Sequence, residues 1–294
     1  MPQLTMFDLP ISFPVVNVSS VPQRSPFRYP GGKTWLVPHV RRWVRSLGFH
    51  PSKLIEPFAG GGIISLTTAF ENLADSVLMV ELDDDIASVW ETIFSANNKT
   101  LADLITTFQM NTENVFHQLS VPPDGRIKQA FLTILRNRVS HGGIMANGSG
   151  LIKSGENGKG IGSRWYPRTL SRRIRDIDVV ADKIEFVQTD GLAEIERFAG
   201  YNDVVFFVDP PYTAGGKKAG KRLYKHNELD HERLFKELSA VKGDFLMTYD
   251  YSQEIFDLAV HENFDVEPVA MTNTHHARMN ELLVGRDLSW VRRY

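Results

Sequence analysis

The residues best suited to do chemistry are Asp209-Pro210-Pro211-Tyr212, which follow the apolar run 204–208. Proline fixes φ and has no N–H group, so the backbone carbonyls of this turn remain available as acceptors. The Asp209 carboxylate and the Pro210 carbonyl can each accept one hydrogen of a planar aryl amine and aim its lone pair at an electrophile. Tyr212 offers a ring for stacking, worth about 1–3 kcal/mol. The motif predicts chemistry on a ring-bound amine, and a proline-rich loop after a core strand is the alternative.

A second candidate site is the run Glu56-Pro57-Phe58-Ala59-Gly60-Gly61-Gly62, which follows a short apolar segment. Glycines at a strand–helix turn let the backbone approach a ligand closely. Glu81 ends the next apolar run, and an acid in this position typically accepts hydrogen bonds from ribose hydroxyls. The dinucleotide fingerprint G-x-G-x-x-G is absent. The pattern therefore indicates a nucleoside-like cofactor without a pyrophosphate, in contact with Phe58, Gly60 and Glu81.

Two further elements could complete such a cofactor site. Arg28-Tyr29-Pro30-Gly31-Gly32-Lys33 combines a ring, two glycines and a cation. We expect Tyr29, Gly32 and Lys33 to suit a cofactor that has an adenine ring and a carboxylate, although the run could also be a turn before a helix. Asp190 follows another apolar run and could accept a hydrogen bond from an adenine amine or cap the next helix.

Strand-like and helix-like segments alternate along the chain, which predicts a doubly wound α/β domain. Continuous apolar runs typical of buried parallel strands lie at 53–57, 76–80, 184–188, 204–208 and 244–248. Helical patterns lie at 63–73, 84–96, 192–198 and 228–241, and two further strands are expected at 264–270 and 281–285. Ligands bind such sheets beyond the carboxyl ends of the strands, where the glycine run and Asp209 would meet.

Residues 99–183 interrupt this alternation, because they are far longer than a crossover helix requires. Helical patterns at 99–119, 126–139 and 167–183 surround a stretch at 140–167 that is rich in Gly, Ser, Asn and Lys. We interpret residues 99–183 as an inserted, mostly helical subdomain with an extended basic loop. The remaining divisions are an irregular segment at 1–26 and the two parts of the catalytic domain, 27–98 and 184–294.

The net charge of −2 hides local basic clusters. Between Val121 and Arg175 there are eleven Lys or Arg residues and two acids, and five more Lys or Arg lie at 217–225. Basic clusters on both sides of one candidate site suit a polyanionic partner, although each cluster alone could be a solvated surface. The chain has no cysteine, no run of about 20 apolar residues, and no basic head at its N-terminus. We expect a cytoplasmic protein with no membrane segment and no metal site. His275-His276 is also not expected to bind a metal.

These motifs and their order resemble those of the Dam-like adenine-N6 DNA methyltransferases over residues 27–285. The similar elements are the run at 28–33, the glycine motif at 56–62, Glu81-Leu82-Asp83, the 209–212 motif and Asn-Glu-Leu-Leu-Val at 280–284. Glu56 stands where the family often has Asp, Tyr29 where Trp is common, and Thr248-Tyr249-Asp250-Tyr251 replaces a more typical Ser-Asn pattern. None of these departures removes a group that the chemistry needs.

The resemblance implies a Rossmann-like methyltransferase sheet whose insertion recognises the target. It also implies S-adenosylmethionine as cofactor and double-stranded DNA as partner, with the target adenine flipped out of the duplex. The implied catalytic residues are Asp209, Pro210, Pro211 and Tyr212. The implied cofactor residues are Tyr29, Gly32, Lys33, Phe58, Gly60, Glu81, Asp190 and Asp209. The implied DNA-binding residues are Arg136, Asn137, Arg138, His141, Asn147, Lys153, Arg164, Lys217 and Lys221.

Several alternatives stay open at this level. Related Pro-Pro-aromatic motifs also serve planar nitrogens in RNA and in protein glutamine, so a methyltransferase for either substrate is the main alternative. The insertion and the run at 28–33 favour DNA. A DNA-binding protein with an inactive site and a nucleotide-dependent oxidoreductase fit less well, because Asp209 and Tyr212 are intact and the pyrophosphate fingerprint is missing. The recognition sequence, a restriction partner and the oligomeric state, with a monomer among the options, are not specified.

Overall fold

The computed structural model describes residues 18–28, 32–145, 150–152, 155, 158–211, 229–272 and 278–292. The described strands are β1 (Lys53–Glu56), β2 (Ser76–Glu81), β3 (Ile184–Gln188), β4 (Val204–Val208), β5 (Asp244–Asp250), β6 (Asp265–Thr272) and β7 (Arg278–Gly285). The described α-helices are α1 (Val37–Ser46), α2 (Ile63–Glu71), α3 (Asp84–Ile93), α4 (Asn98–Thr107), α5 (Thr112–Ser120), α6 (Arg126–Val139), α7 (Pro167–Ile177), α8 (Gly191–Phe198), α10 (His231–Ala240), α11 (Gln253–His261) and α12 (Ser289–Arg292).

The strands form one sheet in the order β3-β2-β1-β4-β5-β7-β6. Strands β1 to β5 pair in parallel, and β7 lies antiparallel between β5 and β6. The strand order reverses between β1 and β4, because β2 and β3 extend the sheet to one side and β5 to the other. A ligand crevice is expected beyond the carboxyl ends of the strands at this switch point. The predicted α/β class with a Rossmann-like sheet is confirmed.

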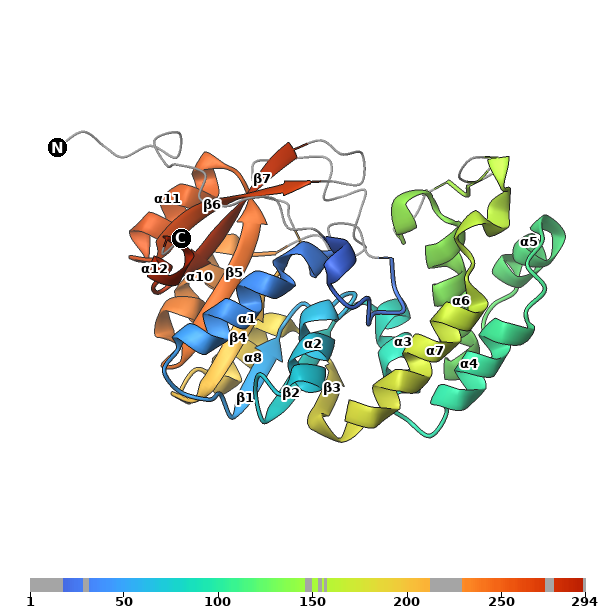
Figure 1. Ribbon diagram of the computed structural model, residues 1–294, viewed down its shortest axis with the longest axis horizontal. Coiled ribbons are helices and arrows are strands. Elements are labelled where there is room, and N and C mark those ends of the chain that lie inside the picture. The colour runs from blue at the N-terminus through green and yellow to red at the C-terminus, as the bar shows by residue number, and fades with distance from the viewer. Residues whose placement is uncertain are drawn as a thin grey trace.

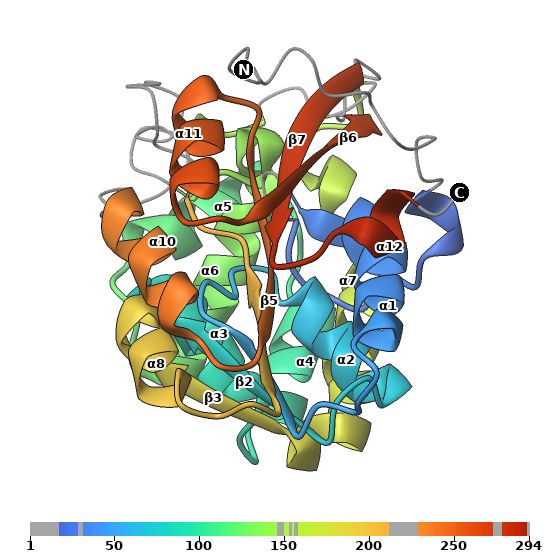
Figure 2. The same ribbon diagram turned by 90° about the vertical axis from the view of Figure 1, so that its left-hand side faces the viewer.

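Helices cover both faces of the sheet (Figure 2). Because successive side chains of a strand point to opposite faces, Phe206 packs with residues of α8, α10 and α11, whereas Phe207 packs with residues of α1, α2 and α12. Strand β4 is buried at every position, which explains its continuous apolar sequence. Trp35, Trp43 and Trp90 are buried in the core.

The predicted insertion contains α4, α5, α6 and α7, which lie together beyond α3 (Figure 1). Buried residues of all four helices, such as Leu101, Phe131 and Ile174, belong to one hydrophobic cluster that continues into Val77 and Met79 of β2. The helices of the insertion therefore pack against the sheet domain through a shared core. This shared core fixes their position relative to the crevice.

Most sequence-predicted elements occur within a few residues of their expected bounds, with two corrections. The single helix expected at 99–119 is wrong, because α4 ends at Thr107 and α5 begins at Thr112. Asn111 causes the break: its side chain accepts a hydrogen bond from the Asn114 N–H at 2.7 Å and caps α5. Helices α11 and α12 were not predicted, and Ser252 caps α11 in the same way. Of the segment expected to be irregular at 1–26, residues 18–26 are described and hold one short 3₁₀ turn, Val18–Ser20.

Candidate active site

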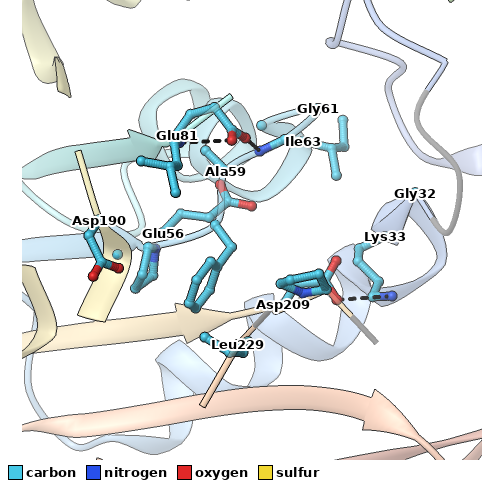
Figure 3. Close-up of a pocket in the computed structure, with 17 residues that line it drawn as sticks. Gly32, Lys33, Glu56, Ala59, Gly61, Ile63, Glu81, Asp190, Asp209 and Leu229 are labelled. Atoms are coloured by element: carbon cyan, nitrogen blue, oxygen red, sulfur yellow. Dashed lines mark hydrogen bonds and ion pairs between the residues drawn. The ribbon is translucent and has the colours of Figure 1, made fainter. Parts of the chain in front are cut away.

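A pocket lies at the switch point, beyond the carboxyl ends of β1, β2 and β4. It is lined by residues 32–33, 56–63, 81–82, 190–191, 209, 211 and 229 (Figure 3). The structure thus brings together seven predicted cofactor residues from five segments of the sequence: Gly32, Lys33, Phe58, Gly60, Glu81, Asp190 and Asp209. The predicted catalytic residue Pro211 lines the same pocket. Tyr29 and Tyr212 lie outside the described residues.

The glycine turn after β1 shapes one wall of this pocket. Gly62 has a φ of +60°, and a Cβ there would lie 2.5 Å from the Met79 Cε and 2.9 Å from the Trp90 ring. Glycine is needed here for both conformation and space. The Trp90 indole N–H donates to the Gly60 carbonyl at 2.9 Å, and the Gly60 N–H donates to the Glu81 carboxylate at 2.9 Å. The turn is therefore fixed against α3 and against the end of β2.

Glu81 faces the pocket from the end of β2 and has the geometry of a hydroxyl acceptor. Its Oε1 accepts the N–H groups of Leu82 and Asp83 at 2.9 Å each, and its Oε2 accepts the Gly60 N–H. A carboxylate has about four acceptor positions, so Oε2 can also accept from a ribose hydroxyl. Burial raises the pKa of Glu81 from 4.5 to about 7, against the lowering effect of these backbone hydrogen bonds.

Glu56, at the end of β1, is a pocket residue that sequence reasoning did not assign. Its carboxylate accepts the Ser65 N–H at 2.9 Å and the Ser65 hydroxyl, so it ties the strand to the first turns of α2. Burial raises the pKa of Glu56 to about 8; the Ser65 hydrogen bonds lower it, and the charges of Asp209 and Glu81 raise it further. The signal for this residue was present in the sequence, as an acid at the end of an apolar run.

Asp190 lies at the start of α8 and lines the pocket on the side away from Lys33 (Figure 3). Its Oδ1 accepts the Leu192 N–H at 3.0 Å, so the N-cap interpretation is confirmed. Gly191 follows it, and a Cβ at this position would overlap the Pro57 carbonyl oxygen. Close packing of α8 on the turn after β1 therefore requires glycine at 191, and it brings the Asp190 carboxylate to the pocket.

Asp209 lies at the end of β4 in a network of buried polar groups. Its Oδ1 lies 3.2 Å from the Lys33 Nζ and accepts the Thr248 hydroxyl at 2.9 Å (Figure 3 shows the Lys33 pair). Lys33 Nζ also lies 3.2 Å from Oε2 of Glu281 on β7. Lys33 is 3% exposed and Glu281 is 6% exposed. Burial raises the pKa of Glu281, while the Lys33 charge lowers it. The network fixes the orientation of the Asp209 carboxylate.

Sequence reasoning assigned no site role to Thr248, Glu281, Leu82 or Leu229. Leu82 and Leu229 line the pocket, whereas Thr248 and Glu281 support Asp209 from β5 and β7. A polar residue within an apolar strand is the signal that Thr248 and Glu281 carry. Only the sheet order places β5 beside β4 and β7 beside β5.

The predicted DNA-binding residues divide into three groups. Asn137 and Arg138 are buried and bond to the backbone of residues 26–28, which does not fit a direct contact with DNA. His141 is exposed, and Arg136 and Arg164 are half-buried, with Nε and Nη1 of Arg164 themselves buried. Asn147, Lys153, Lys217 and Lys221 lie outside the described residues.

The pocket's chemistry fits a cationic nucleoside cofactor. Carboxylates of Glu56, Glu81, Asp190 and Asp209 line it, and Lys33 is its one basic residue among those described. Phe58, Ile63, Leu82 and Leu229 add apolar surface for a ring system. A cluster of acids suits the positive sulfonium and ammonium groups of S-adenosylmethionine, and Glu81 suits its ribose. When bound, this cofactor supplies an electrophilic methyl group.

Among the described residues, no group of three or more His, Cys, Asp or Glu side chains could hold a metal ion. None of the described helices has the length and apolar character needed to cross a bilayer.

The fold is similar to several solved structures at low sequence identity. A Pyrococcus horikoshii protein described as an RNA methyltransferase is 10% identical with a TM-score of 0.40, and the match covers 95% of this chain and 92% of that chain. The rRNA methyltransferase AviRa from Streptomyces viridochromogenes is 14% identical with a TM-score of 0.37, covering 97% and 90%. A Listeria monocytogenes protein described as a class I S-adenosylmethionine-dependent methyltransferase is 9% identical with a TM-score of 0.38, covering 86% and 60%. No curated protein matches the sequence.

A family model gives the decisive comparison, because it matches residues 29–272 and so spans the glycine turn, the insertion and the 209–212 motif. The match agrees with the pocket that the glycine turn and Asp209 line, and S-adenosylmethionine is the cofactor of this chemistry. The chain belongs to the D12 class of N6 adenine-specific DNA methyltransferases.

Proposed function

We propose that this protein transfers the methyl group of S-adenosylmethionine to the N6 amine of adenine in double-stranded DNA. One observation carries the proposal: Asp209, at the head of the Asp-Pro-Pro-Tyr motif, lines the same pocket as the glycine turn and Glu81. An amine held by Asp209 would therefore meet a methyl donor held by the turn. An amine inside a duplex cannot reach this pocket, so the adenine is flipped out of the stack.

In this proposal each residue has a definite task. The Asp209 carboxylate and the Pro210 carbonyl accept the two hydrogens of the amine, which directs its lone pair into the pocket. The network of Lys33, Thr248 and Glu281 fixes that carboxylate in advance, so that little reorganisation is needed during the reaction. Tyr212 stacks on the base. The Glu81 carboxylate accepts hydrogen bonds from the ribose hydroxyls of the cofactor, and the Asp190 carboxylate accepts one from its adenine amine.

DNA binding is assigned to the insertion and to the basic cluster at 217–225, which follows the catalytic motif in the sequence. Arg136, His141 and Arg164 supply contacts from described residues, and Asn147, Lys153, Lys217 and Lys221 complete the set. Contacts with phosphates give affinity and register, whereas a few side chains read base edges in the groove. Asn137 and Arg138 act by holding the protein backbone.

The central test is methyl transfer from labelled S-adenosylmethionine to three matched substrates: duplex DNA, RNA of the same sequence, and a glutamine-containing protein extract. We expect label in the duplex, recovered as N6-methyladenine. Label confined to RNA would assign the enzyme to RNA, and label confined to protein would assign it to glutamine. Asp209→Asn should lose turnover while its affinity for S-adenosylmethionine, measured by calorimetry, stays within a few-fold of the parent. Full turnover in this variant would contradict the role of Asp209.

The DNA interface has a separate test. Arg136→Glu should weaken duplex binding and reduce the slope of log K against log salt by about one unit, because one phosphate contact is lost. Arg197→Glu is the matched control and should keep the parent slope, since Arg197 is an exposed cation outside the insertion that pairs with Glu194 at 3.1 Å. Equal slopes for the parent and Arg136→Glu would remove Arg136 from the interface.

A further inference from the structure

Residues 25–28, which lead into the cofactor run at 28–33, are held by helices of the insertion. Arg173 of α7 donates to the Ser25 carbonyl at 2.9 Å, and Arg138 of α6 donates to the Pro26 carbonyl. Two elements that are distant in the sequence thus bind consecutive carbonyls of one short segment. The segment is fixed to the insertion on one side, while Lys33 lies only a few residues further along the chain.

Asn137 of α6 makes the closest connection. Its Oδ1 accepts the Arg28 N–H at 2.9 Å, and its Nδ2 donates to the Arg28 carbonyl at 2.8 Å. The same Nδ2 donates to the Gly143 carbonyl at 2.9 Å. The Asn137 side chain is 1% exposed. One buried amide therefore satisfies both backbone groups of Arg28 and links them to the start of the basic loop.

Gly143 shows how close this approach is. A Cβ at position 143 would overlap the Arg28 carbonyl oxygen, and Gly143 has a φ of +78°. The loop that follows α6 therefore packs directly on the backbone that precedes the cofactor run. Side chains larger than glycine would push the two apart.

A second connection reaches the glycine turn. The Phe27 ring packs against the Trp90 ring with centroids 5.6 Å apart, and the Trp90 N–H donates to the Gly60 carbonyl. The Gly60 N–H in turn binds Glu81. The held segment thus contacts the glycine turn of the cofactor pocket through Trp90.

We propose that Asn137 is a positioning residue for cofactor binding, and that through it the state of the insertion is coupled to the affinity for S-adenosylmethionine. The coupling to DNA rests on the proposed function, because it requires the insertion to bind the duplex. Coupling between two sites is reciprocal and typically changes affinity by about 5–150-fold. Bound DNA should therefore tighten cofactor binding, and the bound cofactor should tighten DNA binding by the same factor.

The test compares Asn137→Ala with Asn98→Ala. Asn98 is a matched control, because it is also a buried amide, at the first position of α4; it is 3% exposed and its Nδ2 donates to Asp178 at 3.1 Å. Both variants should lose thermal stability. We expect the Kd for S-adenosylmethionine, measured by calorimetry without DNA, to rise at least about tenfold in Asn137→Ala and to stay at the parent value in Asn98→Ala. A folded Asn137→Ala protein with the parent Kd would overturn the proposal.

Should Asn137→Ala fail to fold, Arg173→Gln gives the decision, because Arg173 is half-buried and holds the same segment. The Kd of Arg173→Gln for S-adenosylmethionine should rise by about threefold, and an unchanged Kd would overturn the proposal. The coupling to DNA is tested by repeating the cofactor titration with the duplex at saturating concentration. The duplex should lower the Kd for S-adenosylmethionine in the parent and lower it much less in Asn137→Ala or, if that variant does not fold, in Arg173→Gln. A parent that binds no duplex contradicts the proposed function, while the effect of Asn137 on cofactor affinity alone remains decisive for the positioning role.

Discussion

Lys33 Nζ lies 3.2 Å from Oδ1 of Asp209, so a residue near the start of the sheet domain holds the carboxylate of the catalytic motif. Thr248 donates to the same oxygen, and Glu281 holds Lys33 from the other side. One buried cation thus balances two carboxylates, 3.2 Å from each. This arrangement gives Lys33 a task beyond contact with a cofactor, because it fixes the group that would accept the substrate amine.

Replacement of Lys33 by Met keeps the length of the side chain and removes its charge. Asp209 and Glu281 would then repel each other without a cation between them, and the pKa of Glu281, which Lys33 lowers, should rise further. We expect kcat to fall about 100-fold, in the range seen when a preorganised group of an active site is removed. Steady-state methyl transfer to duplex DNA gives this number.

Lys53→Met is the control for this variant. Among the described residues, Lys53 pairs with a single carboxylate, that of Glu185 at 3.3 Å, and lies at the start of β1, away from the pocket at its end. Its activity should match the parent, since exposed ion pairs contribute about 0–1 kcal/mol. Parent-like kcat in Lys33→Met would show that Asp209 needs no cation.

Thr248→Val tests the second donor to Asp209 with almost no change in shape. Thr248 is fully buried and its hydroxyl lies 2.9 Å from Oδ1 of Asp209. A hydrogen bond to a charged group contributes about 1.5–3 kcal/mol, so kcat should fall about 10- to 100-fold while the cofactor Kd changes little. Thr92→Val is the control, because its buried hydroxyl bonds only to the Ser88 carbonyl of its own helix among the described contacts. An equal loss in both variants would assign Thr248 to stability alone.

The strands of this protein could be predicted because parallel strands buried on both faces are continuous apolar runs. Strand β4, buried at every position, matches its expected bounds at both ends. The edge strand β3 matches them too, although most of its residues are exposed or half-buried. The helices that sequence reasoning missed or merged depend on caps. Asn111 and Ser252 each begin a helix through one side-chain hydrogen bond, and such polar residues are common in loops as well.

The site could be predicted where its functional residues are neighbours in the sequence, as in the glycine turn and the motif that begins at Asp209. Glu281 and Thr248 could not, because their role depends on strand order. The antiparallel β7 inserts between β5 and β6, and this pairing sets Glu281 opposite Asp250, near the end of β5. Arg138 shows the converse error: a basic residue in a basic stretch suggested DNA, but folding buries it against Pro26.

Cofactor binding should depend on pH through Glu81. Burial raises its folded-state pKa to about 7, with the Asp83 charge acting in the same direction, so much of the carboxyl is protonated below pH 7. Ribose hydroxyls and a cationic ligand favour the ionised form, so binding is coupled to proton release. We expect the Kd for S-adenosylmethionine to fall as the pH rises from 6 to 8, as Glu81 loses its proton.

Calorimetry of the parent and of Glu81→Gln at each pH isolates this effect, because ionisation of the ligand is common to both titrations. Glu81→Gln should bind weakly at pH 8 and lose most of the slope. The remaining slope belongs to Glu56, whose pKa burial raises to about 8. A Glu81→Gln protein with the parent slope would show that Glu81 does not titrate on binding.

Gly191→Ala should damage the cofactor site through packing. The added Cβ would overlap the Pro57 carbonyl, a rigid backbone atom, so the start of α8 must move away from the turn after β1. Overpacking of this kind costs about 1–3 kcal/mol. The shift would also carry Asp190 away from the pocket that it lines, so we expect a lower melting temperature together with an approximately tenfold weaker affinity for S-adenosylmethionine.

Gly200→Ala is the matched control just beyond the same helix, because no heavy atom lies within 4 Å of its added Cβ. Gly200→Ala should keep both values, and a Gly191→Ala protein that also keeps them would mean that the contact between α8 and the turn does not set the geometry of the pocket.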